Sequence, residues 1–223
     1  MNIKCKLVVE GVETEILVDS NLIYQLMLKR YLELGGDREY LWKVPVVPGN
    51  VVVEVGGYTG RYTEQILSRY DARIFVLEPV KKFYNQLSAK FNNSKNVTLV
   101  NYGLGKPGLT KFGVVGAGTG AFASTTHFEE VELKSFKDFL HEQSLSSVDI
   151  LMVNIEGGEY ELVPQLLQPD IIQNIRRLYI QFHLTAPNAV MERDVIRKSL
   201  TTTHREVFSF PFVWECWEYK GVQ

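Results

Sequence analysis

Short apolar runs alternate with amphipathic stretches along most of the chain. The apolar runs lie at 51–55, 74–77, 97–100, 150–153 and 178–180. Runs of this length are typical of strands that are buried on both faces of a parallel sheet. Amphipathic stretches that fit helices lie at 59–70, 79–91, 135–141, 159–167 and 190–200. This alternation predicts a doubly wound α/β sheet.

The two ends of the chain depart from this pattern. Residues 4–18 fit two short strands around Glu10-Gly11, and a helix over 21–34 follows, which Gly35-Gly36-Asp37 ends. Residues 206–219 are strand-like and aromatic, with Pro211 at a bend, and predict an antiparallel hairpin on the sheet edge. We therefore expect a small N-terminal cap over 1–47 and a main domain over 48–223.

Composition narrows the class of partner. The chain has 223 residues, and its 24 Lys+Arg against 26 Asp+Glu leave a net charge of −2. Such a charge balance does not favour binding to nucleic acid or to an anionic membrane, so we expect a small-molecule or glycan substrate. Cys5 and Cys216 lack the spacing of a zinc site. No signal peptide or membrane span is evident, which predicts a cytoplasmic protein, and the sequence leaves a homo-oligomer open.

Polar residues follow several of the predicted strands. They are Glu54 with Gly56-Gly57-Tyr58-Thr59-Gly60, Glu78, Asn101, Asn154 with Glu156, and Gln181 with His183. In an open α/β sheet, ligands bind at the carboxyl ends of the strands. We therefore expect these residues to converge on one cleft.

The first of these groups favours S-adenosylmethionine over a dinucleotide. Its glycines miss the G-x-G-x-x-G spacing of a dinucleotide site. A carboxylate such as Glu54 would repel a pyrophosphate, whereas it would attract the ammonium and sulfonium groups of S-adenosylmethionine. We expect a cofactor site formed by Glu54, Gly56, Gly57, Tyr58 and Gly60.

Glu78 ends the second strand of the predicted sheet, where a carboxylate can accept hydrogen bonds from both ribose hydroxyls. The alternative is a charge that merely favours the start of the next helix. The preceding Glu54 and glycines favour the ribose role. Asn101 and Asn154 are expected to assist in binding the cofactor.

At this point the chain resembles the FkbM family of S-adenosylmethionine-dependent methyltransferases. The matching stretches are VVVEVGGYTGRYTEQI (51–66), IFVLEP (74–79), VNYGLG (100–105), VELKSFKDFL (131–140), DILMVNIEGGEYELV (149–163) and LYIQFH (178–183). The resemblance implies a Rossmann-like methyltransferase sheet of seven strands. It also implies O-methylation of a hydroxyl on a sugar or natural product.

The sequence departs from the family pattern at Asn154, where Asp is more common. An amide cannot act as a carboxylate base and is a poorer ligand for a hard cation. A metal site formed by Glu156, Glu159 and His183 has no supporting ligand spacing, so no metal is expected. The missing carboxylate also supports a rival interpretation, a non-catalytic module that binds S-adenosylmethionine or a partner. A nicotinamide oxidoreductase is a weaker rival, because Glu54 opposes it.

Methylation of a hydroxyl requires that the hydroxyl lose a proton. His183 is the first candidate for the base and Glu156 the second. The alternative for His183 is a rim histidine bound to a carbonyl, and the alternative for Glu156 and Glu159 is a charge at a helix start. A second glycine cluster, at 116–120, is followed by no amphipathic helix, so we expect a loop near the cleft.

Overall fold

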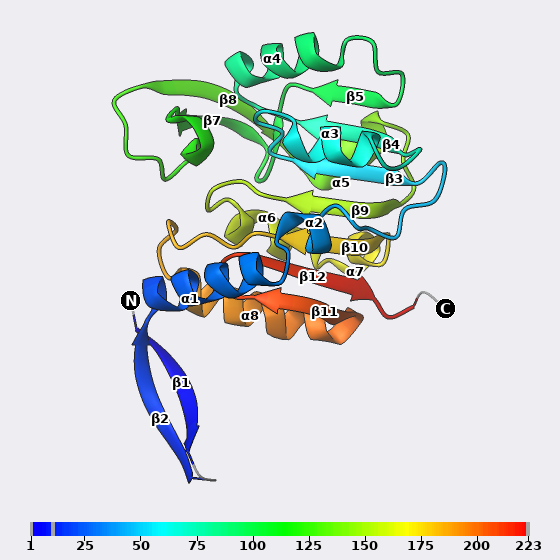
Figure 1. The fold of residues 1–223 in the computed structure, drawn as a ribbon. Coiled ribbons are helices and arrows are strands. Elements are labelled where there is room, and N and C mark those ends of the chain that lie inside the picture. The colour runs from blue at the N-terminus through cyan, green and yellow to red at the C-terminus, as the bar shows by residue number, and fades with distance from the viewer. Residues whose placement is uncertain (1, 10–11, 222–223) are drawn as a thin grey trace.

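The computed structural model describes residues 2–9 and 12–221. Its central sheet contains β3 (Val51–Val55), β4 (Arg73–Leu77), β5 (Val97–Val100), β9 (Val148–Val153), β10 (Ile175–Ile180), β11 (His204–Phe210) and β12 (Trp214–Tyr219). The strand order is β11-β12-β10-β9-β3-β4-β5, and β12 is antiparallel to both of its neighbours (Figure 1). The predicted fold class is confirmed, and so is the C-terminal hairpin on the sheet edge.

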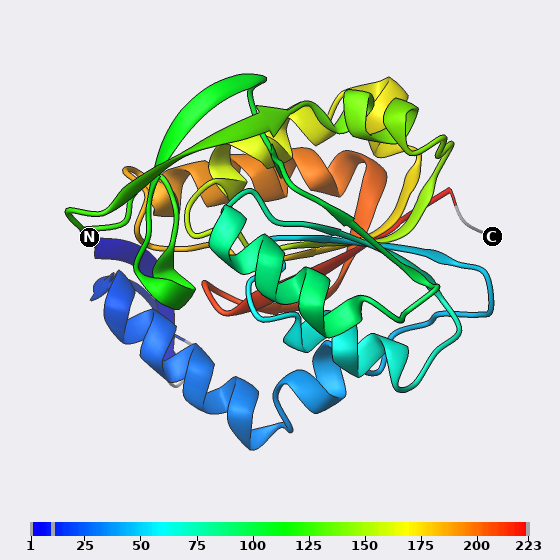
Figure 2. The ribbon, with the colours of Figure 1, turned by 90° about the horizontal axis from the view of Figure 1, so that it is seen from above.

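Helices cover both faces of this sheet, as Figure 2 shows from above. One face packs against α5 (Phe136–Glu142), α6 (Glu159–Leu166), α7 (Pro169–Ile172) and α8 (Ala189–Thr203). The other face packs against α1 (Ser20–Glu33), α3 (Arg61–Leu67) and α4 (Lys81–Phe91). Within β3, Val53 belongs to the first core and Val52 to the second. A strand buried on both faces can be apolar at consecutive positions, which explains the runs seen in the sequence.

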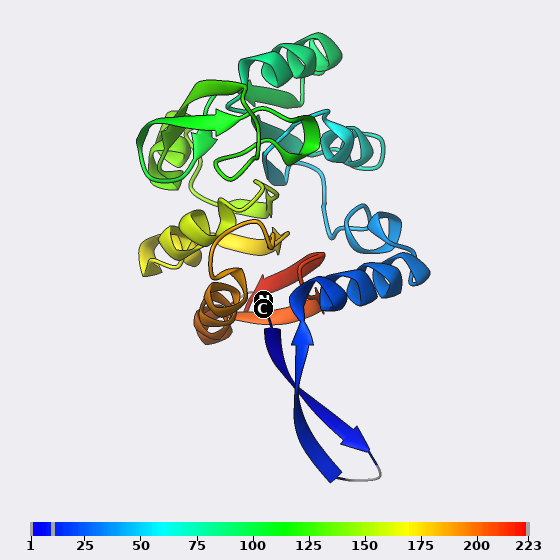
Figure 3. The ribbon, with the colours of Figure 1, turned by 90° about the vertical axis from the view of Figure 1, so that its left-hand side faces the viewer.

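A small second sheet lies at the carboxyl edge of the main sheet (Figures 1 and 3). It consists of β6 (Gly103–Leu104), β7 (Gly108–Gly113) and β8 (Phe128–Lys134), in the order β6-β8-β7. The segment between β7 and β8 contains a short 3-10 helix at Gly116–Gly118. This sheet was not predicted from the sequence, because β7 and β8 are mostly exposed and carry no apolar run.

The N-terminal part combines a hairpin with two helices. Strands β1 (Asn2–Val9) and β2 (Val12–Asp19) pair along their length and project away from the main sheet (Figures 1 and 3). The carboxylate of Asp19 accepts a hydrogen bond from the backbone N–H of Asn21, which caps α1. The short helix α2 (Asp37–Tyr40) follows, and Tyr31 and Leu41 enter the second core. The predicted strands and helix are confirmed here, the turn expected at Glu10-Gly11 lies outside the described residues, and α2 was not predicted.

Across the described ranges 2–9 and 12–221, every helix is too short or too polar to cross a membrane.

Candidate functional site

The chain turns sharply where β3 ends. Gly56 has a φ of +92°, and a Cβ atom on it would lie 2.2 Å from the backbone oxygen of Asn154. Gly60 has a φ of +70°, and a Cβ there would lie within 3 Å of Phe91 and Leu87. Both positions therefore require glycine, because the backbone angle and the space exclude a side chain. The two strands β3 and β9 thus meet backbone to backbone at Gly56.

Glu54 is buried beneath this turn, with 5% of its surface exposed. Its carboxylate accepts a hydrogen bond from the hydroxyl of Thr63 on α3. Burial raises the pKa of Glu54 to about 8, because the charged form is poorly solvated there. A cationic ligand beside this carboxylate would restore the charged form.

Glu78 is equally buried at the end of β4. Its two carboxylate oxygens accept hydrogen bonds from the backbone N–H groups of Tyr58 (2.8 Å) and Val80 (2.9 Å). Burial raises its pKa despite these bonds. Each oxygen retains a further lone pair that can accept from a ligand hydroxyl. Glu78 therefore connects the β3 turn to the start of α4 and still has capacity to bind.

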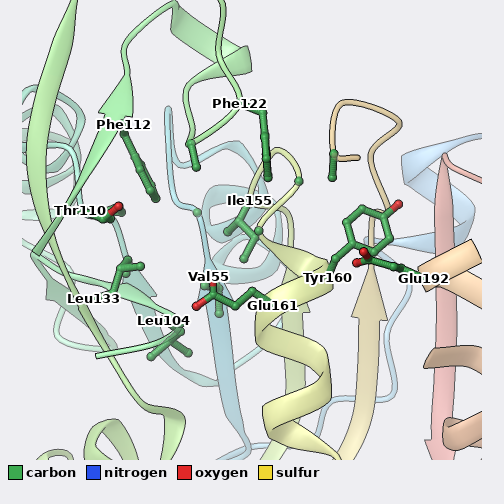
Figure 4. Close-up of a pocket in the computed structure, with 18 of the residues that line it drawn as sticks. Val55, Leu104, Thr110, Phe112, Phe122, Leu133, Ile155, Tyr160, Glu161 and Glu192 are labelled. Atoms are coloured by element: carbon green, nitrogen blue, oxygen red, sulfur yellow. The ribbon is translucent and has the colours of Figure 1, made fainter. Parts of the chain in front are cut away.

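Three cavities meet at this edge of the sheet. The aromatic cavity, of about 440 Å³, lies between α1, α2 and the strand ends, and its lining includes Tyr31, Trp42 and Trp214. The middle cavity, of about 130 Å³, is lined by Glu78, Phe83 and the 116–119 segment, among others. The apolar cavity, of about 420 Å³, is shown in Figure 4, and its lining includes Leu104, Phe112, Leu133 and Tyr160. Gly56 lines all three cavities, so one extended ligand could pass through them.

Asn154 lines both the aromatic and the middle cavity. Its side-chain oxygen Oδ1 is buried and has no hydrogen-bond partner among the described residues. A buried acceptor without a partner costs free energy, which a bound donor would recover. The free amide oxygen, the space at Gly56 and the two carboxylates together fit a ligand that carries an ammonium group and hydroxyls. These are features of S-adenosylmethionine.

A second cluster of charged residues lies behind the turn that follows β9. The ring of His183 is within 2.9 Å of a Glu159 oxygen through Nδ1 and within 3.1 Å of a Glu156 oxygen through Nε2. Burial lowers the pKa of His183, but the hydrogen bonds and charges of Glu156 and Glu159 outweigh it and raise the pKa to about 10. The ring is therefore protonated at neutral pH.

The predicted site residues fall into two groups. Glu54, Gly56, Gly57, Tyr58, Glu78, Asn154 and Glu156 line the cavities. Gly60, Asn101 and His183 line none of the three. Asn101 instead donates from Nδ2 to the backbone oxygens of Glu78 (2.9 Å) and Pro79 (3.2 Å), which braces the β4 end. The cofactor and catalytic roles predicted for all these residues stay predictions.

The aromatic side chains that α1 and the segment after α2 place on the aromatic cavity were not predicted from the sequence. Tyr24, Tyr31 and Trp42 reach the aromatic cavity from a segment far from the strand ends in sequence. The only signal was the spacing of Tyr24 and Tyr31, seven residues apart and hence on one helix face. The predicted loop at the cleft is confirmed, since Gly116, Ala117 and Thr119 line the middle cavity. Within residues 2–9 and 12–221, no group of three His, Cys, Asp or Glu side chains is arranged to hold a metal ion.

Structural comparisons support the fold. An rRNA methylase from Streptococcus thermophilus superposes with a TM-score of 0.51 at 10% identity, over 82% of this chain and 93% of that one. Aeropyrum pernix fibrillarin in complex with S-adenosyl-L-methionine gives a TM-score of 0.47 at 12% identity, over 97% and 82% of the two chains. A Streptococcus mutans protein described as a methyltransferase, in complex with SAH, gives a TM-score of 0.49 at 10% identity, over 84% of this chain and 97% of that one. At 10% identity, the similarity to the Streptococcus thermophilus structure supports the fold alone.

Comparison by sequence is more specific. Among curated proteins, none matches the chain closely enough to count as a relative. The model of the methyltransferase FkbM domain matches residues 51–210, well over half of the chain. This range contains the strand ends at the three cavities, the buried carboxylates of Glu54 and Glu78, and the Glu156–Glu159–His183 cluster. The chain therefore belongs to the FkbM family and is an S-adenosylmethionine-dependent methyltransferase.

Proposed function

We propose that the protein methylates a hydroxyl group on a sugar or another small natural product. The observation that carries this proposal is the position of Glu156, a residue with a carboxylate side chain that lines the same cavity as Glu78. A hydroxyl needs a proton acceptor when it attacks a methyl group, and Glu156 supplies one beside the expected cofactor site.

The three cavities suggest how the chain holds its cofactor, which supplies an electrophilic methyl group when bound. Glu54 and the free oxygen of Asn154 are suited to the ammonium end, and Glu78 is suited to the ribose hydroxyls. The apolar cavity, with Pro79 and Ile155 on its wall, is suited to the adenine ring. Asn154 keeps an acceptor oxygen even though it lacks the charge of Asp, so the departure from the family pattern is compatible with binding.

Glu156 is the better candidate for the base. His183 has carboxylates on both ring nitrogens and carries a proton on each at neutral pH, so it has no free lone pair to offer. In the proposed step, the acceptor O–H proton moves to a Glu156 oxygen. S-adenosylmethionine, held by Glu54, Glu78 and Asn154, would supply the methyl group for the acceptor oxygen. This reverses the order of the two candidates that the sequence suggested.

The aromatic cavity supports a neutral acceptor. Its wall includes Tyr24, Trp42 and Trp214. Of its charged residues, Asp37 and Arg61 pair with each other at 3.5 Å, and Glu54 is the one assigned above to the cofactor. Aromatic rings offer flat apolar surfaces with few polar groups, which suit the faces of a sugar ring. The chain's net charge of −2 offers no attraction for a polyanion such as RNA.

The test is an assay of S-adenosylhomocysteine release with a panel of sugars, glycans and phenolic natural products. We expect turnover with at least one hydroxyl acceptor and a loss of about 10²–10⁴-fold in kcat for Glu156→Gln. Glu64→Gln, in the first turn of α3, is the control and should retain activity. Turnover on RNA alone would contradict the proposed substrate class. Cofactor binding without turnover on any acceptor would favour a non-catalytic module, the alternative that Asn154 supports.

A further inference from the structure

Glu159 is a fully buried carboxylate at the start of α6, with 0% of its surface exposed. A glutamate that only favours a helix start remains in water, because burial of a carboxylate is costly unless partners compensate it. Glu159 has three such partners. One oxygen accepts from the N–H of Ile155 (2.9 Å) and lies 2.9 Å from His183 Nδ1, and the other accepts from the N–H of Gly157 (2.9 Å).

Two of these partners flank Glu156 in the chain. Glu156 has a φ of +52° and Gly157 a φ of +103°, so the backbone enters the left-handed region at both residues. For a residue with a side chain this conformation costs about 1–3 kcal/mol and persists only where surrounding contacts hold it. The carboxylate of Glu159 bonds the N–H on either side of Glu156 and thereby holds this turn.

The third partner reaches the side chain of Glu156. His183 follows β10, and its backbone oxygen accepts a hydrogen bond from the hydroxyl of Tyr160 (2.8 Å). The charged groups that face its ring are Glu159, from α6, and Glu156, from the turn after β9. The ring therefore bridges the two carboxylates, and its Nε2 contacts that of Glu156, a residue that lines the middle cavity.

We propose that Glu159 is a positioning residue: it holds the 155–157 turn and the His183 ring, and through them it fixes the Glu156 carboxylate at the wall of the middle cavity. Glu159 itself lines none of the three cavities described above. The inference rests on the proposed function for the role of Glu156, but the arrangement that it describes can be measured without an acceptor.

The first measurement is the NMR titration of the His183 ring in the full chain, assigned by comparison with His183→Gln. Glu159→Gln keeps the size of the side chain and removes its charge. We expect the midpoint of His183 to fall by at least one pH unit, while the control Glu64→Gln leaves it unchanged. A folded Glu159→Gln protein with an unchanged His183 midpoint would overturn the proposal.

The second measurement separates positioning from cofactor binding. In calorimetry, Glu159→Gln should bind S-adenosylhomocysteine within about threefold of the unsubstituted protein, whereas kcat should fall about 10–100-fold where an acceptor is known. An equal loss of cofactor affinity would contradict the proposal, because Glu159 would then belong to the cofactor site. If the proposed acceptor class fails, the titration still decides the positioning role.

If Glu159→Gln does not fold, Glu159→Asp provides the test. Aspartate keeps the charge, but its side chain is shorter by one methylene group, so the distance from its carboxylate to His183 Nδ1 increases. The expected midpoint of His183 lies below that of the unsubstituted protein, and cofactor affinity is retained. A midpoint equal to that of the unsubstituted protein would overturn the proposal.

Discussion

Gly56 is the residue at which the backbone of the site is most crowded. A Cβ atom there would overlap the backbone oxygen of Asn154, and φ is +92°. Gly49 has a similar φ of +85°, but no atom lies within 4 Å of the place that a Cβ would take, so it isolates the cost of the angle alone. The two glycines therefore form a matched pair.

We expect Gly56→Ala to lower the free energy of unfolding more than Gly49→Ala does. Each substitution carries about 1 kcal/mol or more for the backbone angle, and only the first adds a clash with β9. Gly56→Ala should also weaken S-adenosylhomocysteine binding, because the residue borders all three cavities. Urea unfolding and calorimetry on both variants measure these effects. Equal losses of stability with intact binding would show that the close approach has no role.

His183 should make stability depend on pH. Burial alone would lower its pKa, but the hydrogen bonds to Glu156 and Glu159 raise it to about 10, against an unfolded value of about 6.5. The stabilisation is therefore complete below about pH 6.5 and is lost as the pH rises towards 10. The raised pKa values of Glu54 and Glu78 also reduce stability as the pH rises.

The contributions of Glu54 and Glu78 cancel when the unfolding free energy of His183→Gln is subtracted from that of the unsubstituted protein. We expect this difference in unfolding free energy to shrink between about pH 6 and about pH 10, as measured by urea unfolding at each pH. A difference that stays constant over this interval would mean that folding does not shift the pKa of the ring.

At the scale of elements, α8 is joined to β12 by buried charges. The guanidinium Nε of Arg193 on α8 donates to Glu215 on β12 at 2.6 Å, and Arg197 pairs with the other oxygen of Glu215. Trp217 also donates to this carboxylate, at 3.1 Å. Glu215 is 1% exposed, so water cannot replace these partners.

We expect Glu215→Gln to lower the free energy of unfolding by about 3–5 kcal/mol, because it removes the buried counter-charge that Arg193 and Arg197 share. Glu206→Gln is the control: Glu206 also pairs with Arg197, but it is far more exposed, and such pairs contribute about 1 kcal/mol or less. Chemical unfolding of both variants gives the comparison. Similar, small losses would show that the buried pair does not hold α8 to the sheet.

At the scale of the whole molecule, cofactor binding should stabilise the fold. The site joins β3, β4 and β9 with α1 and α2, so a ligand that binds only the folded chain shifts the unfolding equilibrium. At about 100 times its Kd, S-adenosylhomocysteine should add about 2.7 kcal/mol and raise the melting temperature, and NAD should not. Glu78→Gln should reduce the shift. A larger shift with NAD would contradict the cofactor assignment.

Much of the main sheet could be predicted from the sequence because its signals are local. An apolar run such as 150–153 is buried on both faces of the sheet, Glu54 lies near the end of β3, and Glu78 directly follows β4. The small sheet of β6, β7 and β8 could not be predicted in this way. Its strands lie at the surface, and their pairing depends on where the main sheet ends. The division into a cap and a main domain stays a prediction.

Local periodicity was enough to predict most strands and helices and the residues near the end of each strand, and the resemblance of six stretches to the FkbM family indicated the family. How those residues work together depends on the folded chain. His183 and Glu159 are 24 positions apart, and their contact exists because β10 lies beside β9 and the start of α6. The charge of the ring follows from that contact, because two carboxylates in a buried place outweigh the cost of desolvation. A pKa is set by neighbours in space, which the sequence does not display.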